Sequence, residues 1–241
     1  MGAGAPWTWL RRAGDDLRWA PAASLFYGAA FAGMGWVLRL AVGHGEYLLA
    51  LTTGFLLAGP FLAVGLYDLS RRRELGETPR LLPTLTAWRA NAPALGFYAV
   101  ILALLLAAWI RVSIVVVALF FSGGMPDFGH LPDEFLANPE GLVFLAAYLA
   151  AGMGFALLVF ATSVVSIPML LDREKMDALS AMIASFSAVR LNFRVMVLWA
   201  VVVVVITGLG IALHFLGLVL AMPLVGHATW HAYRDAVAPE Q

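Results

Sequence analysis

The sequence contains no cysteine and little charge. The absence of cysteine among its 241 residues excludes disulfide bonds, thiolate catalysis and cysteine-ligated zinc or iron–sulfur sites. Asp, Glu, Lys and Arg together make up only 12% of the chain, against about 25% in soluble domains. The formal net charge is zero, so no basic excess favours nucleic acid as a partner.

The sequence is rich in apolar residues. They make up 62% of the chain, whereas a soluble domain carries roughly 45–50%. A soluble fold of this length would expose a large apolar surface to water, but a bilayer solvates such a surface because lipid tails are as apolar as leucine. The composition therefore predicts an integral membrane protein whose first partner is the lipid bilayer.

Long apolar stretches predict an all-α, polytopic membrane protein with about six transmembrane helices, since each span needs about 20 apolar residues. The stretches are Ala22–Val42, Tyr47–Leu69, Ala94–Phe121, Leu142–Leu171 and Val195–Trp230. The last is too long for one span. Gly208 and Gly210 mark an expected turn that divides it into a short fifth span, about Phe193–Thr207, and a sixth.

Lysine and arginine lie almost entirely on one side of the predicted spans. Thirteen of the 15 fall in the termini and in the loops near Arg71–Asn91 and Asp172–Arg194, while the opposite loops contain none. Positive residues mark the cytoplasmic side. The sequence therefore predicts a bacterial inner-membrane protein with both termini in the cytoplasm.

A repeated pattern groups the spans into three hairpins within a single membrane domain, residues 1–241. Pro21 precedes Arg39 by 18 residues, and Pro93 precedes Arg111 by the same number. A short amphipathic stretch, expected to lie at the membrane interface, precedes each hairpin. The three units cover about 7–70, 81–172 and 175–234, and their amphipathic stretches begin near Trp7, Leu81 and Met176.

Arg39 and Arg111 are the charges embedded in apolar sequence. At 1.5 Å per residue each lies about 27 Å from its proline, which is the outer interface rather than the bilayer centre. Anchoring at headgroup level is the favoured interpretation, because an arginine at this depth can extend its charge to water. A ligand or ion role is the alternative.

Three further side chains are candidate polar sites. His227 and His231 are spaced i, i+4 and share a helix face, but GHATWHAYRD lacks the carboxylate of a zinc-protease helix. We expect both histidines to be structural, with metal or haem binding as the alternative. Asp68 lies at the end of the second span beside Arg71–Arg73, so ion pairing is favoured over a proton relay. No catalytic, cofactor or metal site is predicted.

Small residues at four-residue spacing predict close helix contacts. In the first span they are Gly28 and Ala32, and in the fourth Ala146, Ala150 and Gly154.

Four segments resemble an uncharacterised prokaryotic family of integral membrane proteins, catalogued as domain of unknown function 2189. They are GPFLAVGLYDLSRR, TAWRAN, SVVSIPMLLDR and GHATWHAYRD, and the resemblance runs from about Asp16 to Asp235. Some members are labelled putative cytochrome c oxidase subunits, which implies at most a respiratory neighbourhood. The chain lacks the spread of intramembrane histidines that a haem–copper catalytic subunit needs, so the resemblance implies no catalysis.

The leading functional hypothesis is a non-enzymatic accessory or scaffolding component of a membrane complex, with a respiratory complex as a possible partner. A small-solute or ion transporter is the second hypothesis, suggested by the repeat and by hydroxyl side chains inside the spans. A haem- or metal-binding protein of the respiratory chain, using His227 and His231, is the third.

The predicted topology can be tested with single cysteines, because the chain has none of its own. Cysteines introduced at Gly4, Gly76, Gly129 and Gln241 are exposed to an impermeant thiol reagent in intact cells. Only the Gly129 position should react, since the other three are expected in the cytoplasm. Labelling at position 76 without permeabilisation would show that the topology is wrong.

Overall fold

A computed structural model describes residues 1–41, 62–121 and 139–237 of the chain. Within these ranges the chain forms helices and connecting turns, and no strand occurs. The all-α class predicted from the sequence is therefore confirmed for the described residues.

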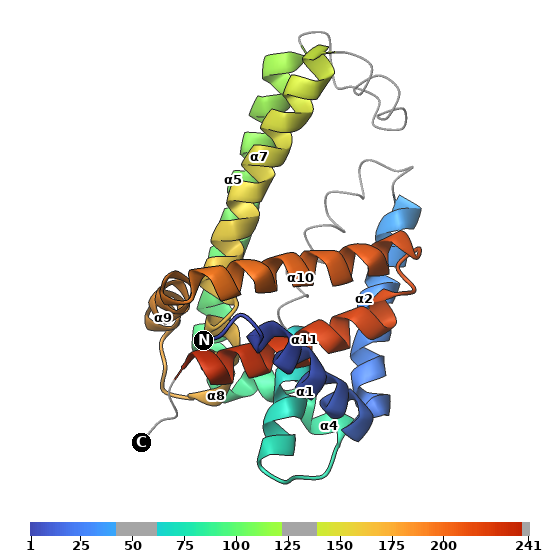
Figure 1. Cartoon of the computed structure of the whole chain (residues 1–241), viewed down its shortest axis with the longest axis vertical. Coiled ribbons are helices and arrows are strands. Elements are labelled where there is room, and N and C mark those ends of the chain that lie inside the picture. The colour runs from blue at the N-terminus through green and yellow to red at the C-terminus, as the bar shows by residue number, and fades with distance from the viewer. Residues whose placement is uncertain (42–61, 122–138, 238–241) are drawn as a thin grey trace. The chain divides into compact units, whose positions relative to one another are not determined.

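The chain folds into two compact units, Val100–Phe160 and the remainder, Met1–Ala99 with Ala161–Gln241. The smaller unit contains most of α5 (Ala92–Phe120) and α7 (Pro139–Ser163), which run side by side in Figure 1. A hydrogen bond of 3.0 Å joins the Ser113 and Tyr148 hydroxyls. Few residues of the two helices are buried, so their apolar surface faces outward.

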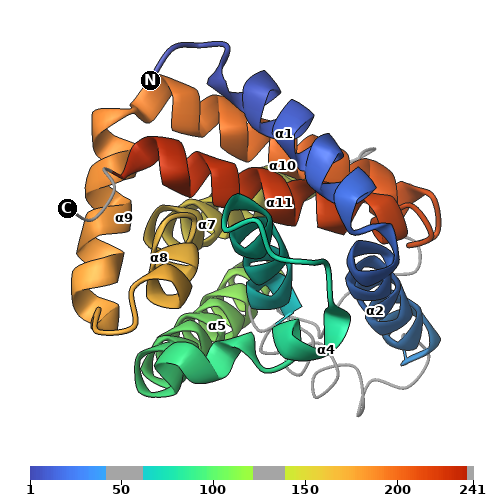
Figure 2. The same ribbon diagram turned by 90° about the horizontal axis from the view of Figure 1, so that it is seen from below.

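The larger unit is a bundle in which α11 occupies the centre. Its helices are α1 (Ala5–Trp19), α2 (Pro21–Ala41), residues 62–74, α4 (Leu81–Thr84), η1 (Ala87–Asn91), α8 (Ser166–Asp172), α9 (Ala178–Leu191), α10 (Phe193–Ala212) and α11 (Leu218–Ala236). Helices α1, α2 and α10 pack on α11, and Figure 2 shows α1 and α10 running along the same side of it. Every residue of α11 from Val225 to Tyr233 is buried.

Four described helical stretches are long and apolar enough to cross a membrane: Pro21–Leu40, Leu81–Phe120, Pro139–Asp172 and Phe193–Ala212. The predicted second span, Tyr47–Leu69, lies largely outside the described residues. Helix α11 carries the predicted sixth span but is not among the four. The described residues thus support four spans, and the six-span hairpin arrangement stays a prediction.

The expected turn at Gly208 and Gly210 is wrong, because α10 continues through both glycines to Ala212. The chain reverses just after the helix ends, where His214 and Phe215 adopt φ values of 54° and 65°. A Cβ on Gly210 would lie 2.7 Å from Leu218 Cδ2. The glycine therefore permits α10 and α11 to approach each other closely, and the turn itself relies on non-glycine residues with left-handed backbone.

The amphipathic stretches before the predicted hairpins have different structures. The first and third form the helices α1 and α9, but the second is divided between the single turn α4 and the 3-10 helix η1. Helix α1 turns its apolar face inward, where Trp9 and Ala13 are fully buried. Trp7, near which this stretch begins, is 59% exposed.

The small residues of α2 make the close contact expected of them, whereas those of α7 do not. A Cβ on Gly28 would overlap the backbone carbonyl of Val219 in α11, and Ala32 is buried against Leu218. In α7, by contrast, a Cβ on Gly154 would meet nothing within 4 Å. Trp109 instead approaches the glycine at position 152.

Substitution of Gly28 by alanine should destabilise the protein, because the new methyl group forces α2 away from the α11 backbone. Overpacking of this kind costs about 1–3 kcal/mol. Gly33→Ala is the matched control on the same helix, since Gly33 has open space around it and alanine favours helix by about 1 kcal/mol. Unfolding in detergent should show a loss of stability for Gly28→Ala only. Equal stability of the two variants would contradict the close contact.

Candidate functional site

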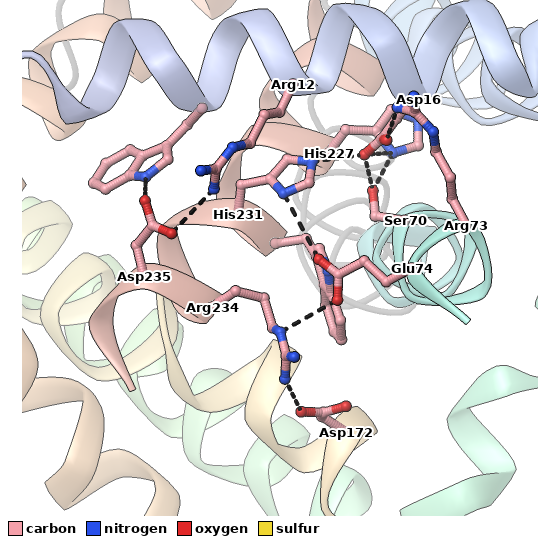
Figure 3. A network of polar contacts seen from close by, with 12 residues as sticks. Arg12, Asp16, Ser70, Arg73, Glu74, Asp172, His227, His231, Arg234 and Asp235 are labelled. Carbon is pink, nitrogen blue, oxygen red and sulfur yellow. Dashed lines mark hydrogen bonds and ion pairs between the residues drawn. The ribbon is translucent and has the colours of Figure 1, made fainter. Parts of the chain in front are cut away.

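A set of polar side chains is buried where α1, α2, residues 62–74 and α11 meet, and Figure 3 shows those that come from α1, residues 62–74 and α11. We call it the buried polar cluster, and its members are Asp16, Ser24, Ser70, His227 and His231. Each is at most 7% exposed. Polar groups at such depth must be hydrogen-bonded, because an unpaired one loses its hydration without compensation.

A chain of hydrogen bonds runs through His227. Ser70 donates to Asp16 across 2.6 Å, which leaves the Ser70 oxygen free to accept a proton from His227 Nδ1 at 2.7 Å. The neutral imidazole then accepts at Nε2 from Ser24, 2.9 Å away. His227 lies outside the four stretches that can cross a membrane. Burial lowers the pKa of His227 to about 4, which agrees with a neutral imidazole between Ser24 and Ser70.

The Asp16 carboxylate accepts hydrogen bonds from several side chains in and around the cluster. Its Oδ2 atom accepts from Ser70 and from His231 Nε2 at 2.8 Å, while Oδ1 accepts from Arg73 at 2.6 Å. Burial raises the pKa of this carboxyl, but hydrogen bonds from His231 and Ser70 and the Arg73 guanidinium outweigh it and hold the pKa at about 2. Asp16 is therefore ionised over the whole physiological range.

A second row of contacts continues from the cluster along α11. Glu74 accepts from Trp230 Nε1 at 3.1 Å and pairs with Arg234 at 3.2 Å, and its carboxylate lies 3.9 Å from His231 Nδ1. Arg234 also reaches Asp172 at the end of α8, 3.3 Å away. These pairs join α11 to residues 62–74 and to α8.

The last turn of α11 is tied to α1 in the same way. Asp235 accepts from Trp9 Nε1 at 2.7 Å and from Arg12 at 3.0 Å. The Trp9 ring also packs edge-on against Trp199 of α10, with centroids 5.6 Å apart. Helix α1 is thus attached to the bundle at two places, through Asp16 and through Trp9 and Arg12.

The two predicted histidines both belong to the cluster and use their ring nitrogens within the protein. Among the described residues, no group of three or more metal-ligating side chains is present. Asp68 is also fully buried, but it forms a separate site. Its carboxylate pairs with Arg71 at 3.0 Å and Arg72 at 2.7 Å, the local ion pairing that its sequence position favours.

Arg39 and Arg111 are exposed on their helices, one in each compact unit. The Arg39 guanidinium lies 5.9 Å from the centre of the Trp36 ring, a cation–π contact. Their role as interfacial anchors stays a prediction.

Sequence patterns did not identify Asp16, Ser24 and Ser70 as site residues. One of them left a signal, because Asp16 follows Trp9 and Ala13 at helical spacing and so places a carboxylate on the apolar face of α1. A charge at such a position requires a buried partner. Ser24 and Ser70 gave no comparable signal, since serine packs in helices without a special role.

The order Ser24, His227, Ser70, Asp16 resembles the way an acid orients a histidine beside a nucleophilic serine. Ser24 and His227 are, however, fully buried, so a substrate cannot reach the hydroxyl in this conformation. An open depression of about 390 Å³ in the larger unit lies elsewhere, beside the start of α9. The hydrogen bonds of the cluster join four helices of the larger unit.

Removal of the Asp16 charge should destabilise the larger unit. Asp16→Asn keeps the size of the side chain but leaves Arg73 without its counter-ion, and we expect a loss of about 2–4 kcal/mol in unfolding free energy. Asp15→Asn is the control, because the Asp15 side chain is 45% exposed and pairs with Arg18 at the surface. Such a surface pair contributes at most about 0.5–1 kcal/mol. Denaturation in detergent compares the two, and similar losses would contradict the account.

The unfolding free energy should fall as the pH is lowered, because the unfolded chain binds more protons than the folded chain does. His227 has an ordinary pKa of 6.5 and a folded pKa of about 4, so its contribution decreases as the pH falls through this window. At about 1.4 kcal/mol per pKa unit the loss is about 3 kcal/mol. Asp16 adds a further loss between its ordinary pKa of 3.8 and about 2. Unfolding curves measured from pH 7 to pH 4 test this, and a His227→Gln variant should show a shallower dependence than the wild type.

Comparison with known proteins gives a family and no function. Residues 48–172 match the family model described as predicted integral membrane protein, domain of unknown function 2189. The match is shorter than the resemblance described above and leaves out GHATWHAYRD, which supplies His227 and His231. No curated protein and no solved structure matches the chain. Since the matched segment covers more than half of the 241 residues, the chain belongs to this family of integral membrane proteins.

Proposed function

We propose that the protein is a non-enzymatic structural component of the bacterial inner membrane, acting as an accessory or scaffolding subunit of a membrane complex. The observation that carries the proposal is that the side chains of the buried polar cluster make their hydrogen bonds to one another. Hydrogen bonds join the members of the cluster to one another, and these members lie on four helices, α1, α2, residues 62–74 and α11. Their hydrogen bonds are therefore made within the bundle and stabilise it.

The outward apolar surface supports a role based on lateral contacts. In α5 and α7, Leu104, Leu119 and Leu149 are 59–77% exposed, whereas Phe144 is only 4% exposed between the two helices. Such surfaces pack against lipid or against another membrane protein. The one-sided distribution of Lys and Arg supports an orientation with both termini in the cytoplasm.

Transport is the second candidate, favoured by one observation. The hydrogen bonds from Ser24 through His227 and Ser70 to Asp16 form a continuous path along which a proton can move. Proton-coupled transporters use buried carboxylates and histidines of this kind. Metal or haem binding gains no such support, because His227 Nδ1 and Nε2 both have serine partners.

Photo-crosslinking in native membranes tests the scaffold proposal. A benzophenone amino acid placed at Leu119 or Leu149 should give a discrete crosslinked protein band in the native host, since both positions face outward. The same probe at Phe144 is the matched control and should give none, because its ring is enclosed by Phe120 and Phe121. Lipid adducts alone from the outward positions would contradict the proposal.

Two further measurements separate the other candidates. A fluorophosphonate probe should leave Ser24 unlabelled, and labelling that disappears in Ser24→Ala would make the protein an enzyme. Purified protein in vesicles should show no proton flux above that of Asp16→Asn. Flux that is lost in this variant would favour transport, and stoichiometric metal or haem lost with His227→Ala would favour a cofactor protein.

A further inference from the structure

Helix α9 has two faces of different character. Its inner face consists of small residues, Ala178, Ala181, Ser185 and Ala188, all of them buried. Ser185 fixes this face to the bundle, since its hydroxyl donates to the Ala161 carbonyl at 2.8 Å and accepts from the Val165 amide at 3.2 Å. The orientation of α9 about its own axis is therefore determined by contacts within the larger unit.

The outer face of α9 carries large apolar side chains that are mostly exposed. Leu179 and Ile183 are each 59% exposed, and Phe186 is 52% exposed. With Arg190 they follow the spacing i, i+4, i+7, i+11, which places them in one stripe along a helix. We call Leu179, Ile183 and Phe186 the α9 stripe. Three large apolar side chains in a row on one outward-facing helix mark a binding surface.

The position of α9 in the chain indicates what covers the stripe. Only Asn192 separates α9 from α10, whose residues Phe193–Ala212 qualify as a membrane span. Figure 2 shows α9 turned sharply across the end of α10. If α10 crosses the bilayer, α9 lies along the surface of the bilayer, because it turns sharply across the end of α10 (Figure 2). Phe193, at the start of α10, is 64% exposed and continues the apolar surface.

Charge at the C-terminal end of α9 matches an anionic surface. Arg190 and Arg194 are exposed there, whereas Lys175, before the N-terminal end, is exposed beside the equally exposed Glu174. The nearby Asp177 is engaged in capping the helix, where it accepts from the Ser180 amide at 2.9 Å. The depression of about 390 Å³ beside the start of α9 is lined by Glu174, Lys175 and Asp177 together with apolar residues. The basic attraction to an anionic surface therefore comes from the C-terminal end of the helix.

We propose that α9 binds the headgroup layer of an anionic bilayer, with the α9 stripe inserted at the level of the upper acyl chains. Arg190 and Arg194 contact lipid phosphates, an electrostatic attraction that basic residues near such a surface contribute. An exposed apolar stripe with basic residues at one end suits a helix that lies in this layer. The proposal does not depend on a scaffolding role.

Single nitroxide labels can test this directly, because the chain has no cysteine to remove. Cysteines at Ile183 and Phe186 place labels on the stripe. Ser187→Cys is the matched control, since Ser187 is exposed beside the stripe on the same helix. The protein is placed in vesicles of phosphatidylethanolamine and phosphatidylglycerol, and accessibility to oxygen and to a water-soluble nickel chelate is measured. We expect the ratio of oxygen to nickel accessibility to be several-fold higher at positions 183 and 186 than at 187.

A charge variant tests the anionic part of the proposal. Arg190→Gln with Arg194→Gln should make the label at 183 shallower in the vesicles containing phosphatidylglycerol and should have no effect in neutral phosphatidylcholine. Equal nickel accessibility at 183, 186 and 187 would overturn the proposal. So would dipolar broadening between labels, which would show a second copy on the stripe, or an equal effect of the charge variant in both lipids. Thermal unfolding of each variant identifies any that is misfolded, and labels at Leu179 then replace it.

Discussion

An aspartate carboxylate with almost no contact with water is the constraint on which the larger unit depends. Asp16 is 2% exposed, and an ion at that depth is stable only when paired and hydrogen-bonded. Its three partners come from distant parts of the chain, Ser70 and Arg73 on one helix and His231 on another, 215 residues away from Asp16 in sequence. Meeting this requirement brings the N-terminal and C-terminal helices together around residues 62–74.

The cluster also explains why α11 is buried although it carries polar residues. His227 and Trp230 are fully enclosed, and each has a hydrogen-bond partner on residues 62–74, Ser70 for the first and Glu74 for the second. The approach is possible because neighbouring helices present glycine where α11 passes, as at Gly28. Apolar helices placed around such a centre can then face lipid, while the polar groups stabilise the arrangement from within.

Composition and periodicity predicted the helical class, the membrane environment and the helices α1, α2, α5, α7, α9 and α10. They failed where one residue type has two uses. Glycine is common in turns, but Gly210 lies inside α10 and permits its close contact with α11. The sequence therefore predicts the turn several residues too early. The buried face of α1 cannot be predicted from the sequence alone, because Trp7 and Trp9 are both apolar and only Trp9 packs on Trp199. The histidines were identified from their spacing, but their partners Asp16 and Ser70 could not be, since pairing across the chain leaves no local pattern.

A double-mutant cycle between Asp16 and His231 tests the account most directly. The unfolding free energies of Asp16→Asn, His231→Gln, the double variant and the wild type are compared in detergent. If the 2.8 Å contact between these side chains holds α1 to α11, the two losses should be non-additive by about 1–3 kcal/mol. Losses that add to within about 0.5 kcal/mol would show that the two residues act independently, and the buried cluster would then not be the interaction that holds the bundle together.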